Sequence, residues 1–489
     1  MERTWSEQQD AIFGWFESGE GHLVVVARAG TGKTTTIIEG INRAPEQNIV
    51  LTAFNKRIAE ELTNRIANPC AKAQTLHSIG FAAVRRYWSG VRVGNGSDRA
   101  DSLAEAVCGV KTPDVVKRLV SKLHTKAREI NPHARNVGDI TDILYAFECE
   151  PDETWQDAGF DALFVEKKAL AAMELAATVK PIKTGIDFAD MIFLPVRNGW
   201  LAKQYDLVVV DEAQDMTVAQ LEIAQGICRG RIAVVGDDRQ AIYGFRGADS
   251  GSLGRLKNEL NATEMKLTVT YRCGSSIVTE AQRLVPDFQC GAAHEGTINA
   301  IGSDALVQAI SNGDFLLSRT NAPLVSTAFA LLRAGKRARI AGRDIGAGLK
   351  TIVRKLGKGN IGIETMIGRI EAWRDREVRR FTIAKRENQI DQVNDKAETL
   401  LVIAHEASSV ADMEVRIDGL FTDDGLGQAG VITCSSVHRA KGLEADHVFV
   451  LGFTLYPRGV NAEEQNIEYV AITRAKQILT LVHKAEIGE

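Results

Sequence analysis

One stretch decides the fold: VVVARAGTGKTTT, residues 24–36 of a 489-residue chain. Its apolar run predicts a strand, its two glycines predict a loop, and Lys33 and Thr34 open a helical pattern. A strand, a glycine-bearing loop and a helix in this order are what a phosphate-binding loop requires. Ala27 replaces the first glycine of the usual pattern G-x-x-x-x-G-K-[ST]. Since the rest of the pattern fits, the stretch predicts a nucleotide site.

In such a site, backbone N–H groups at the start of the helix face the phosphates. We expect Lys33 to reach the β- and γ-phosphates and the Thr34 hydroxyl to bind Mg²⁺. The residues expected to contact the nucleotide along this loop are Ala29, Gly30, Thr31, Gly32, Lys33, Thr34 and Thr35.

A second segment, VVVDEAQD (residues 208–215), supplies acids suited to nucleotide hydrolysis. Its valines predict a strand, and Asp211 and Glu212 follow at the carboxyl end of that strand. Asp211 is suited to hold Mg²⁺, and Glu212 is suited to polarise the attacking water. Paired acids after a strand can also form a helix N-cap cluster. The phosphate loop elsewhere in the chain favours the catalytic interpretation.

A third segment, IAVVGDDRQAIYGFRGAD (residues 232–249), is a strand pattern that ends in polar residues. Gln240 is placed to sense the γ-phosphate. Tyr243 and Phe245, beside Arg246, are residues on which nucleic-acid bases can stack. Two aromatics at such a place can equally belong to the core, so this interpretation stays open.

The chain alternates β-branched runs with helical patterns over about residues 22–85, 205–345 and 430–484, as parallel α/β sheets do. Residues 86–187 and 346–424 have mostly helical patterns. We therefore predict two α/β cores, each interrupted by a helical insertion. The charged helix near 369–401 could contact DNA, although a solvated helix with i, i+4 pairs is the favoured explanation of its charges. The expected strands are residues 22–27, 49–53, 207–210, 232–235, 267–270, 315–318, 431–434, 447–451 and 478–482, and the expected helices begin at 33 or span 55–66 and 468–476.

Bulk composition fits a globular protein but does not decide its function: 45% of the residues are hydrophobic and 25% are charged. No run approaches the ~20 apolar residues of a membrane span. The first residues, MERTWSEQQDAIF, lack the pattern of a signal peptide, so we expect a cytoplasmic protein without a membrane partner. A net charge of −4 leaves nucleic-acid binding open, because such binding needs only a local basic groove. The scattered cysteines predict neither a zinc site nor a disulfide framework.

In their order and wording, these segments resemble the UvrD/Rep (PcrA-like) DNA helicases of superfamily 1A. VVVDEAQD is similar to motif II of that family, and VVGDDRQAIYGFRGAD to motif III. SEQQDAI (residues 6–12) resembles the Q-motif, which implies that Gln8 binds adenine. LTAFNKRIAEEL (51–62) and QTLHSIGF (74–81) resemble motifs Ia and Ib, which contact single-stranded DNA in the family. The resemblance thereby implies DNA contacts for Phe54, Asn55, Lys56, Thr75 and His77.

Four further segments resemble motifs IV, IVa, V and VI: LTVTYR (267–272), LLSRTN (316–321), TCSSVHRAKGLEADHVFVLG (433–452) and EYVAITRAK (468–476). They imply that Tyr271 packs on the adenine and that Arg272 and Arg474 contact the γ-phosphate, Arg474 as the second arginine finger. The remaining implied contacts are Glu444 with the ribose or the motor interface, and Arg319 and His438 with DNA.

The resemblance implies two RecA-like parallel-sheet P-loop domains, each with a mainly helical insertion. We expect the first at residues 1–85 and 188–265 with its insertion at 86–187, and the second at 266–345 and 425–489 with its insertion at 346–424. ATP is expected between the lobes, so that Arg272 and Arg474 act when that cleft closes. Hydrolysis would then drive the closing and opening that move the lobes along a strand.

Two departures from the family pattern are visible. Motif Ia reads T-A-F-N-K where many relatives have T-F-T-N-K, so Phe54 is displaced by one position. The insertion at 346–424 is much shorter than the 2B domain of the family, as in compact bacterial or phage-encoded members. The short insertion weakens the expectation of processive unwinding but leaves that of translocation intact.

The resemblance implies an ATP-dependent DNA helicase or translocase that uses ATP and Mg²⁺. It would move 3′ to 5′ on single-stranded DNA, bind junctions of single and double strands and act as a monomer in replication, repair or recombination. An alternative is a single-strand-dependent ATPase that works within a larger repair or phage-defence complex and unwinds little. A small-molecule P-loop enzyme is a third class, but it leaves motifs Ia, Ib and V unexplained.

Overall fold

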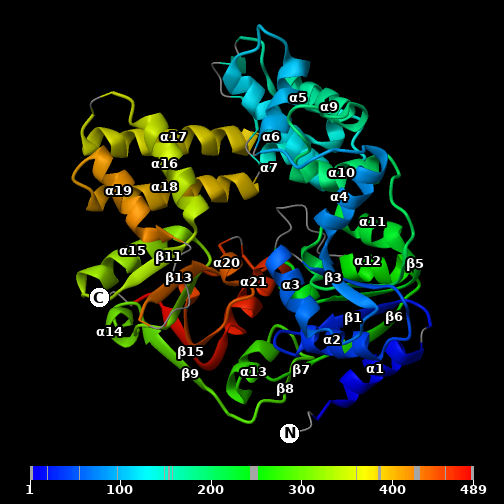
Figure 1. Cartoon of the computed structure of the whole chain (residues 1–489). Helices are drawn as coiled ribbons and strands as arrows, with labels where there is room; N and C mark the ends of the chain where they lie inside the picture. Colours follow the sequence, from blue (N-terminus) through cyan, green and yellow to red (C-terminus); the bar gives the residue numbers. More distant parts are fainter. Residues whose placement is uncertain are drawn as a thin grey trace. The chain divides into compact units, whose positions relative to one another are not determined.

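The computed structural model places most of the chain in two mixed α/β units (Figure 1). By their contacts, Met1–Ala27 and Gly32–Leu267 form the first unit, and Arg28–Thr31 and Thr268–Glu489 form the second. The residues that the structure describes are 4–18, 20–53, 55–95, 97–147, 149–151, 155–156, 158–242, 252–359, 361–383, 387–422, 430–457 and 459–485.

The first unit is built on a six-stranded sheet of order β3-β2-β4-β5-β1-β6 in which every pairing is parallel. This order sets β4, β5 and β1 side by side, so the loops that follow their carboxyl ends meet at one edge. In open parallel sheets that edge is where ligands bind. The strands are β1 (Leu23–Ala27), β2 (Ile49–Ala53), β3 (Ala71–Thr75), β4 (Tyr205–Val210), β5 (Cys228–Gly236) and β6 (Thr263–Leu267).

Helices cover both faces of this sheet, which explains why its central strands are apolar at successive positions. In β1, Leu23 and Val25 face a cluster that includes Ile12 of α1 and Ile37 of α2. Val24 faces a second cluster on the other side, which includes residues of α4, α10 and α11. The helices that pack on the sheet are α1 (Glu7–Ser18), α2 (Lys33–Arg43), α3 (Lys56–Arg65), α4 (Leu76–Tyr87), α10 (Phe188–Arg197), α11 (Val218–Ile227) and α12 (Ser252–Glu259).

A helical insertion separates α4 from α10 and has a hydrophobic core of its own. Its helices are α5 (Asp98–Cys108), α6 (Asp114–Ile130), α7 (Thr141–Ala146) and α9 (Ala162–Thr178). The chain enters and leaves the insertion through two segments that touch at an isolated parallel bridge between Val93 and Ile186. Where α4 packs on α10, a Cβ on Gly80 would lie 1.8 Å from the carbonyl oxygen of Met191, so only glycine permits this approach.

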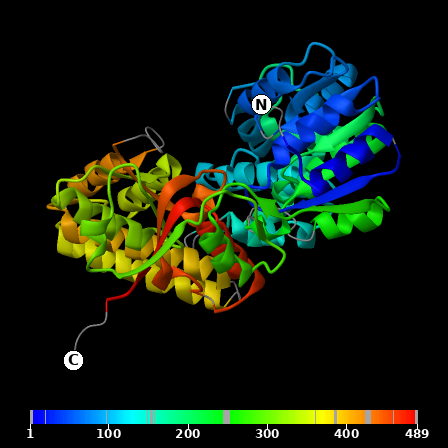
Figure 2. The ribbon, with the colours of Figure 1, turned by 90° about the horizontal axis from the view of Figure 1, so that it is seen from below.

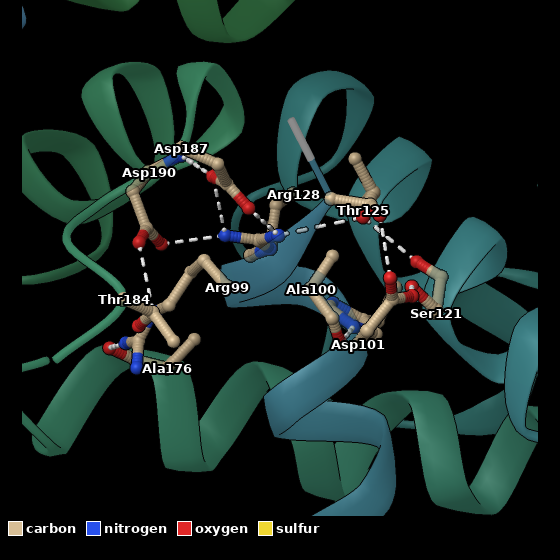
Figure 3. A network of polar contacts seen from close by, with 12 residues as sticks. Arg99, Ala100, Asp101, Ser121, Thr125, Arg128, Ala176, Thr184, Asp187 and Asp190 are labelled. Atoms are coloured by element: carbon tan, nitrogen blue, oxygen red, sulfur yellow. Dashed lines mark hydrogen bonds and ion pairs between the residues drawn. The ribbon is translucent and has the colours of Figure 1, made fainter. Parts of the chain in front are cut away.

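Buried charges fix the point at which the insertion returns to the sheet (Figure 3). Arg128 of α6 is fully buried and donates to Asp187 at 2.7 and 3.0 Å and to Asp190 at 2.5 Å. Arg99 of α5 donates to Asp190 at 3.1 Å. Asp187 also caps α10, because its side chain accepts a hydrogen bond from the backbone N–H of Asp190. Two arginines and two carboxylates thereby join α5, α6 and the start of α10 without an unbalanced buried charge.

The second unit is built on a seven-stranded sheet of order β12-β11-β13-β10-β14-β15-β9, again with every pairing parallel. Its strands are β9 (Thr297–Gly302), β10 (Phe315–Ser318), β11 (Ala338–Ala341), β12 (Phe421–Thr422), β13 (Ile432–Ser436), β14 (Ala445–Leu451) and β15 (Ala475–His483). A small separate sheet pairs β7 (Val269–Thr270) with β8 (Gln289–Cys290). The helices among and beside the strands are α13 (Ser275–Gln282), α14 (Leu306–Ala309), α15 (Asn321–Arg333), α20 (Val437–Ala440) and α21 (Ala462–Ile472).

Four further helices lie between β11 and β12 in the chain: α16 (Arg343–Leu356), α17 (Ile363–Ile383), α18 (Glu387–Glu406) and α19 (Val410–Leu420). The long helices α17 and α18, yellow in Figures 1 and 2, lie side by side. Both units therefore combine a parallel sheet with a helical insertion, and the predicted α/β fold class is confirmed. Among the described residues no helix is long and apolar enough to cross a membrane.

Two predicted elements are wrong in their bounds. The strand expected at 267–270 is split, because Thr263–Leu267 pairs with β1 whereas Val269–Thr270 pairs with β8. Most of β6 is exposed at a sheet edge and lacks the apolar run that marks a buried strand. The helix expected over 468–476 ends at Ile472. Thr473 bonds back to the carbonyl of Tyr469 at 2.8 Å, and β15 begins two residues later.

Candidate functional site

The phosphate loop leads from β1 into α2, as predicted. Gly32 caps α2 with φ 78°, a left-handed conformation that favours glycine. Gly30 also has a positive φ, of 69°. The Thr31 hydroxyl donates to the carbonyl of Arg28 at 2.9 Å, and Ala29 is buried. By their contacts Ala29, Gly30 and Thr31 belong to the second unit, whereas Gly32 and the residues after it belong to the first.

Lys33, the first residue of α2, is directed at acids of its own unit. Its side chain is only 10% exposed, and its Nζ lies 3.3 Å from a carboxylate oxygen of Glu212. Burial lowers the pKa of Lys33, but Glu212, Asp237 and Asp211 outweigh it, so the pKa lies above its ordinary value. Lys33 therefore stays charged, as a phosphate ligand must.

Asp211 and Thr34 lie together at the same sheet edge. The Thr34 hydroxyl donates to a carboxylate oxygen of Asp211 at 3.3 Å. Burial and the neighbouring Glu212 raise the pKa of Asp211 to about 6. At this pKa a cation bound beside Asp211 would stabilise its ionised form.

The Thr34 hydroxyl and the Asp211 carboxylate fit an Mg²⁺ ion that is bound together with a nucleotide. Among the described residues no cluster of three or more His, Cys, Asp or Glu side chains could hold a metal by itself. A nucleotide-bound Mg²⁺ needs only one or two protein ligands, because phosphates and waters complete its coordination. The oxygens of Thr34 and Asp211 are hard ligands of the kind that this ion prefers.

Glu212 has a strained backbone, with φ 51° in the left-handed region that non-glycine residues rarely adopt. Its backbone N–H donates to Asp211 at 2.9 Å, and its carboxylate accepts from Gln214 at 2.6 Å. The other end of the buried Gln214 amide accepts from the backbone N–H of Asp237 at 3.0 Å. Gln240 donates to the Asp237 carboxylate at 2.8 Å. Gln214 thus links Glu212 to the segment that carries Gln240, a role that sequence analysis did not assign.

At the other side of the loop, the glutamine in contact with α2 is Gln9. It is buried, donates to the Thr36 hydroxyl at 2.9 Å and lies within 4 Å of where a Cβ on Gly32 would be. Gln8 is half-buried, as is Thr35. Sequence analysis selected Gln8, but the helical spacing of Gln9 with the buried Ile12, Phe13 and Phe16 could have indicated Gln9.

In the second unit, Arg272 and Glu444 form a salt bridge at 2.6 Å, and Lys476 adds a second at 2.9 Å. Burial raises the pKa of Glu444, but Lys476 and Arg272 together lower it by more. The pKa of Glu444 therefore lies below its ordinary value. Glu444 is therefore held as an anion between two cations. Tyr271, next to this cluster in sequence, is 49% exposed.

Arg474 is only 1% exposed, and its guanidinium donates to the backbone carbonyls of Val470 at 3.0 Å and Leu443 at 3.1 Å. Burial, with repulsion from Arg272, lowers the pKa of Arg474 to about 10. Two cations packed together are stabilised by added negative charge, as from a phosphate.

The expected nucleic-acid residues of the first unit have mixed surroundings. Asn55 caps α3 by accepting from the N–H of Ile58, and Thr75 caps α4 by accepting from the N–H of Ser78. Lys56 is 91% exposed. The structure brings Lys56, Thr75 and His77 together around one cleft, whereas Phe54, Tyr243, Phe245 and Arg246 lie outside the described residues.

The cleft has a volume of about 800 Å³ and lies among α3, β3, α4 and α10. His77 and Phe188 meet in an edge-to-face contact at 5.9 Å between ring centroids. Burial lowers the pKa of His77, so the ring is neutral at pH 7. The residues that line the cleft are Lys56, Ala59, Glu60, Thr63, Asn64, Ala73, Gln74, Thr75, His77, Ser78, Phe81, Val93, Phe188 and Met191.

Phe188 is a candidate that sequence analysis missed. It is 65% exposed although it opens a helix whose next residues are buried. Its two acidic neighbours, Asp187 and Asp190, are the partners of Arg128, so the start of α10 is held firmly while the ring remains free for a ligand. The sequence carries no signal for this ring, because neither the burial of Asp187 and Asp190 nor the exposure of Phe188 can be read from it.

The remaining expected DNA residues belong to the second unit. Arg319 makes a bidentate pair with Glu464 at 2.9–3.1 Å, and its side chain is 14% exposed. That pair occupies its guanidinium, so Arg319 has less capacity to bind a phosphate. His438 lies half-buried in the short helix α20.

Comparison with known proteins identifies the family. A model of the UvrD/REP helicase N-terminal domain matches residues 6–261, just over half of the chain, and a model of the UvrD-like helicase C-terminal domain matches residues 364–486. These matches fall on both units and cover the segments similar to the family's motifs except LTVTYR (267–272) and LLSRTN (316–321), which lie between the two matched ranges.

Similar relatives include F-box DNA helicase protein 1 of Schizosaccharomyces pombe, which is 26% identical over 97% of this chain and 57% of its own length. ATP-dependent DNA helicase UvrD2 of Mycobacterium tuberculosis is 24% identical over 97% of this chain and 78% of its own. A probable DNA helicase II homolog of Rickettsia conorii is 26% identical over 57% of this chain and 44% of its own. The chain spans about half the length of the first and third of these relatives. It belongs to the UvrD/REP helicase family of superfamily 1A.

Proposed function

We propose that this protein is an ATP-dependent DNA helicase or translocase that moves along single-stranded DNA. One observation carries the proposal. The first unit brings Lys33, Thr34, Asp211 and Glu212 together at the carboxyl edge of its sheet, and the same unit carries a cleft with aromatic rings and one lysine in its lining. A phosphate site and a strand site on the same unit allow changes at the nucleotide to act on bound DNA.

For the chemistry, the start of α2 and Lys33 would bind the phosphates of ATP. Thr34 and Asp211 would hold Mg²⁺, which neutralises phosphate charge when bound. Glu212, held by Gln214 and oriented by its strained backbone, would accept a hydrogen bond from the attacking water and align it with the γ-phosphate. Gln240 would sense the phosphate through Asp237 and Gln214.

The nucleotide would gain further contacts from residues outside this acid cluster. Gln9 would read the adenine, because it lies against the loop. From the family resemblance, Tyr271 would pack on the base, Glu444 would hold the ribose, and Arg272 and Arg474 would stabilise charge on the γ-phosphate.

The DNA would lie in the cleft of the first unit. Lys56, which is 91% exposed and lies 3.7 Å from Glu60, supplies a positive charge for a phosphate, and Phe188 with the neutral His77 supplies ring surfaces for bases. Such contacts are tolerant of sequence because every base has a π-face. His438 of the second unit is proposed as a further contact.

Movement from 3′ to 5′, binding at junctions, action as a monomer and a role in replication, repair or recombination follow from the resemblance and are part of the proposal. A second candidate is a single-strand-dependent ATPase that serves a larger repair or phage-defence complex. The observation that favours it is the small insertion α16–α19, which covers only residues 343–420.

The two candidates differ in what they do to a duplex. With a 3′-tailed duplex, a 5′-tailed duplex and ATP, a helicase separates the 3′-tailed strands, whereas the ATPase of the second candidate hydrolyses ATP on both tails and separates neither. Displacement of streptavidin from one end of a biotinylated single strand measures translocation without unwinding. Displacement from the 5′ end alone supports the proposed polarity, and displacement from the 3′ end alone contradicts it.

A further inference from the structure

Three segments of the first unit contain no acidic residue, although the chain has 63 Asp and Glu: residues 71–95, 179–186 and 198–205. They cover β3 and α4, one connection of the helical insertion, and the loop that leads into β4. Their basic residues are Lys72, Arg85, Arg86, Arg92, Lys180, Lys183 and Lys203, all of them exposed.

Hydrogen bonds bring the three segments together. Arg86 donates to the Gln204 side chain at 2.9 Å, and Lys180 donates to the carbonyl of Ser89 at 2.6 Å. The Arg92 guanidinium lies 3.4 Å from the carbonyl oxygen of Lys183. The basic side chains of these segments therefore share one surface, which we call the basic platform.

The positive charge of the basic platform is not neutralised. Among the residues that the structure describes, no carboxylate lies within ion-pair distance of any of its seven basic side chains. Ordinary protein surfaces intersperse charges of both signs. An uncompensated cluster of one sign attracts a polyanion.

Aromatic rings lie within the same surface. Tyr87 stacks on Trp200 with centroids 4.9 Å apart and planes inclined by 12°, and Trp88 meets Trp200 edge to face at 5.2 Å. Tyr87 is nevertheless 58% exposed, so one face of its ring is packed and the other meets solvent. A rigid ring with one free face amid arginines is a platform for an unpaired base.

The platform continues the cleft described above. The guanidinium of Arg85 lies 5.8 Å from the ring centroid of Phe81, and Phe81 lines the cleft. His77 and Tyr87 lie near opposite ends of α4, roughly 15 Å apart at about 1.5 Å per residue. At a stacked spacing of about 3.4 Å, that distance corresponds to roughly four nucleotides.

We propose that the basic platform is a second single-strand site, at which Arg85 and Arg86 bind phosphates and Tyr87 stacks on a base of a strand that leaves the cleft. The inference rests on the proposed function only in that the strand is single-stranded nucleic acid. A double helix keeps its bases paired and offers no free base to Tyr87. An acidic protein would bind the arginines but would not need the Tyr87 ring.

The experiment measures binding of the full chain to oligothymidylates of 4 and 20 nucleotides by fluorescence anisotropy. The variants are Tyr87→Ala, Tyr87→Phe and the double variant Arg85→Ala with Arg86→Ala. Lys111→Ala, which removes an exposed cation of the helical insertion, is the control. We expect Tyr87→Ala to weaken binding of the 20-mer by roughly tenfold, Tyr87→Phe to restore it and the 4-mer, which is too short to occupy the cleft and Tyr87 together, to be bound normally. The arginine double variant should reduce the salt slope for the 20-mer by about 1.4.

Unchanged 20-mer binding in Tyr87→Ala and the double variant would overturn the inference, as would equal losses for both lengths. A loss in the double variant without a loss in Tyr87→Ala would also overturn it, because charge alone would then explain the surface. A wild-type chain that binds neither length would instead contradict the proposed function. Melting temperatures of the variants within a few degrees of wild type show that the fold is kept.

Discussion

The Nζ of Lys33 lies 3.3 Å from the carboxylate of Glu212, so the two residues proposed for phosphate binding and for water activation are ion-pair partners. A nucleotide phosphate would compete with Glu212 for the ammonium group of Lys33. Gln214 gives Glu212 a second partner, at 2.6 Å, that does not involve Lys33. The same contact therefore offers a route by which nucleotide binding adjusts the proposed catalytic base.

Asp211 should make stability depend on pH. Burial and Glu212 raise its pKa to about 6 from an ordinary 3.8, so the folded chain holds this proton more tightly than the unfolded chain does. Ionised Asp211 therefore costs on the order of 2–3 kcal/mol of folding free energy above pH 6, and this cost fades as the pH falls from 6 towards 4. We expect Asp211→Asn to be more stable than wild type at pH 8, with a smaller difference at pH 5. Urea unfolding at both pH values measures this, and an equal or reversed difference would contradict the assigned environment.

Gln9 and Gln8 can be separated by substitution. Because Gln9 contacts Thr36 and lies beside Gly32, we expect Gln9→Ala to raise the KM for ATP by roughly tenfold and to reduce the preference for ATP over GTP. The neighbouring Gln8→Ala is the control and should change neither. Steady-state kinetics with both nucleotides measures the effect. If Gln8→Ala alone shows the loss, the adenine contact belongs to Gln8.

Phe188 should contribute to DNA binding without contributing to the ATP site. Removing an exposed ring from the cleft should weaken binding of a single strand by roughly 5- to 100-fold, the range for one stacked base. We expect Phe188→Ala to bind ATP normally in equilibrium titrations. Val110→Ala, which truncates a 97% exposed apolar residue of the insertion, is the matched control. Equal affinity of Phe188→Ala and wild type for an 8-nucleotide strand would remove Phe188 from the cleft's function.

Arg128 should be a major source of stability for the insertion. Arg128→Met leaves Asp187 and Asp190 short of a buried partner, and breaking such a pair costs about 3–5 kcal/mol. The control, Arg135→Met, removes an exposed partner of Glu174 and should cost about 1 kcal/mol or less. Chemical denaturation with circular dichroism compares the two. Similar losses in both variants would mean that the buried network contributes no more than a surface pair.

Sequence patterns predicted the buried strands well, because a strand between two helical layers must be apolar throughout. The bounds of β2 and β10 match the prediction, and β4, β5 and β14 extend it at their ends. Edge strand β6 could not be found in this way, since only its last residue is buried. The end of α21 was also missed, because the residues on both sides of it, from Tyr469 to Ala475, are all buried, so hydrophobic spacing does not mark where the helix ends and β15 begins.

The sequence predicted the part of the candidate site that is formed by the phosphate loop and by the ends of strands. Lys33, Thr34, Asp211 and Glu212 meet because β1 and β4 flank β5 in a parallel sheet, an order that the sequence does not state. Gln214 and Phe188 required the structure, because burial of one and exposure of the other are decided by contacts distant in the chain.

The most direct test of the proposed motor is its steady-state ATPase rate with and without single-stranded DNA, at low and moderate salt. The rate is measured for wild type, Lys33→Ala and Glu212→Gln. We expect DNA to raise the wild-type rate by roughly tenfold or more, and salt to reduce this effect by weakening phosphate contacts. Both variants should lose roughly two or more orders of magnitude in rate while they still bind DNA. A wild-type rate that does not respond to DNA would contradict the proposed coupling of ATP hydrolysis to DNA. Near-normal hydrolysis by Glu212→Gln would contradict the proposed role of Glu212.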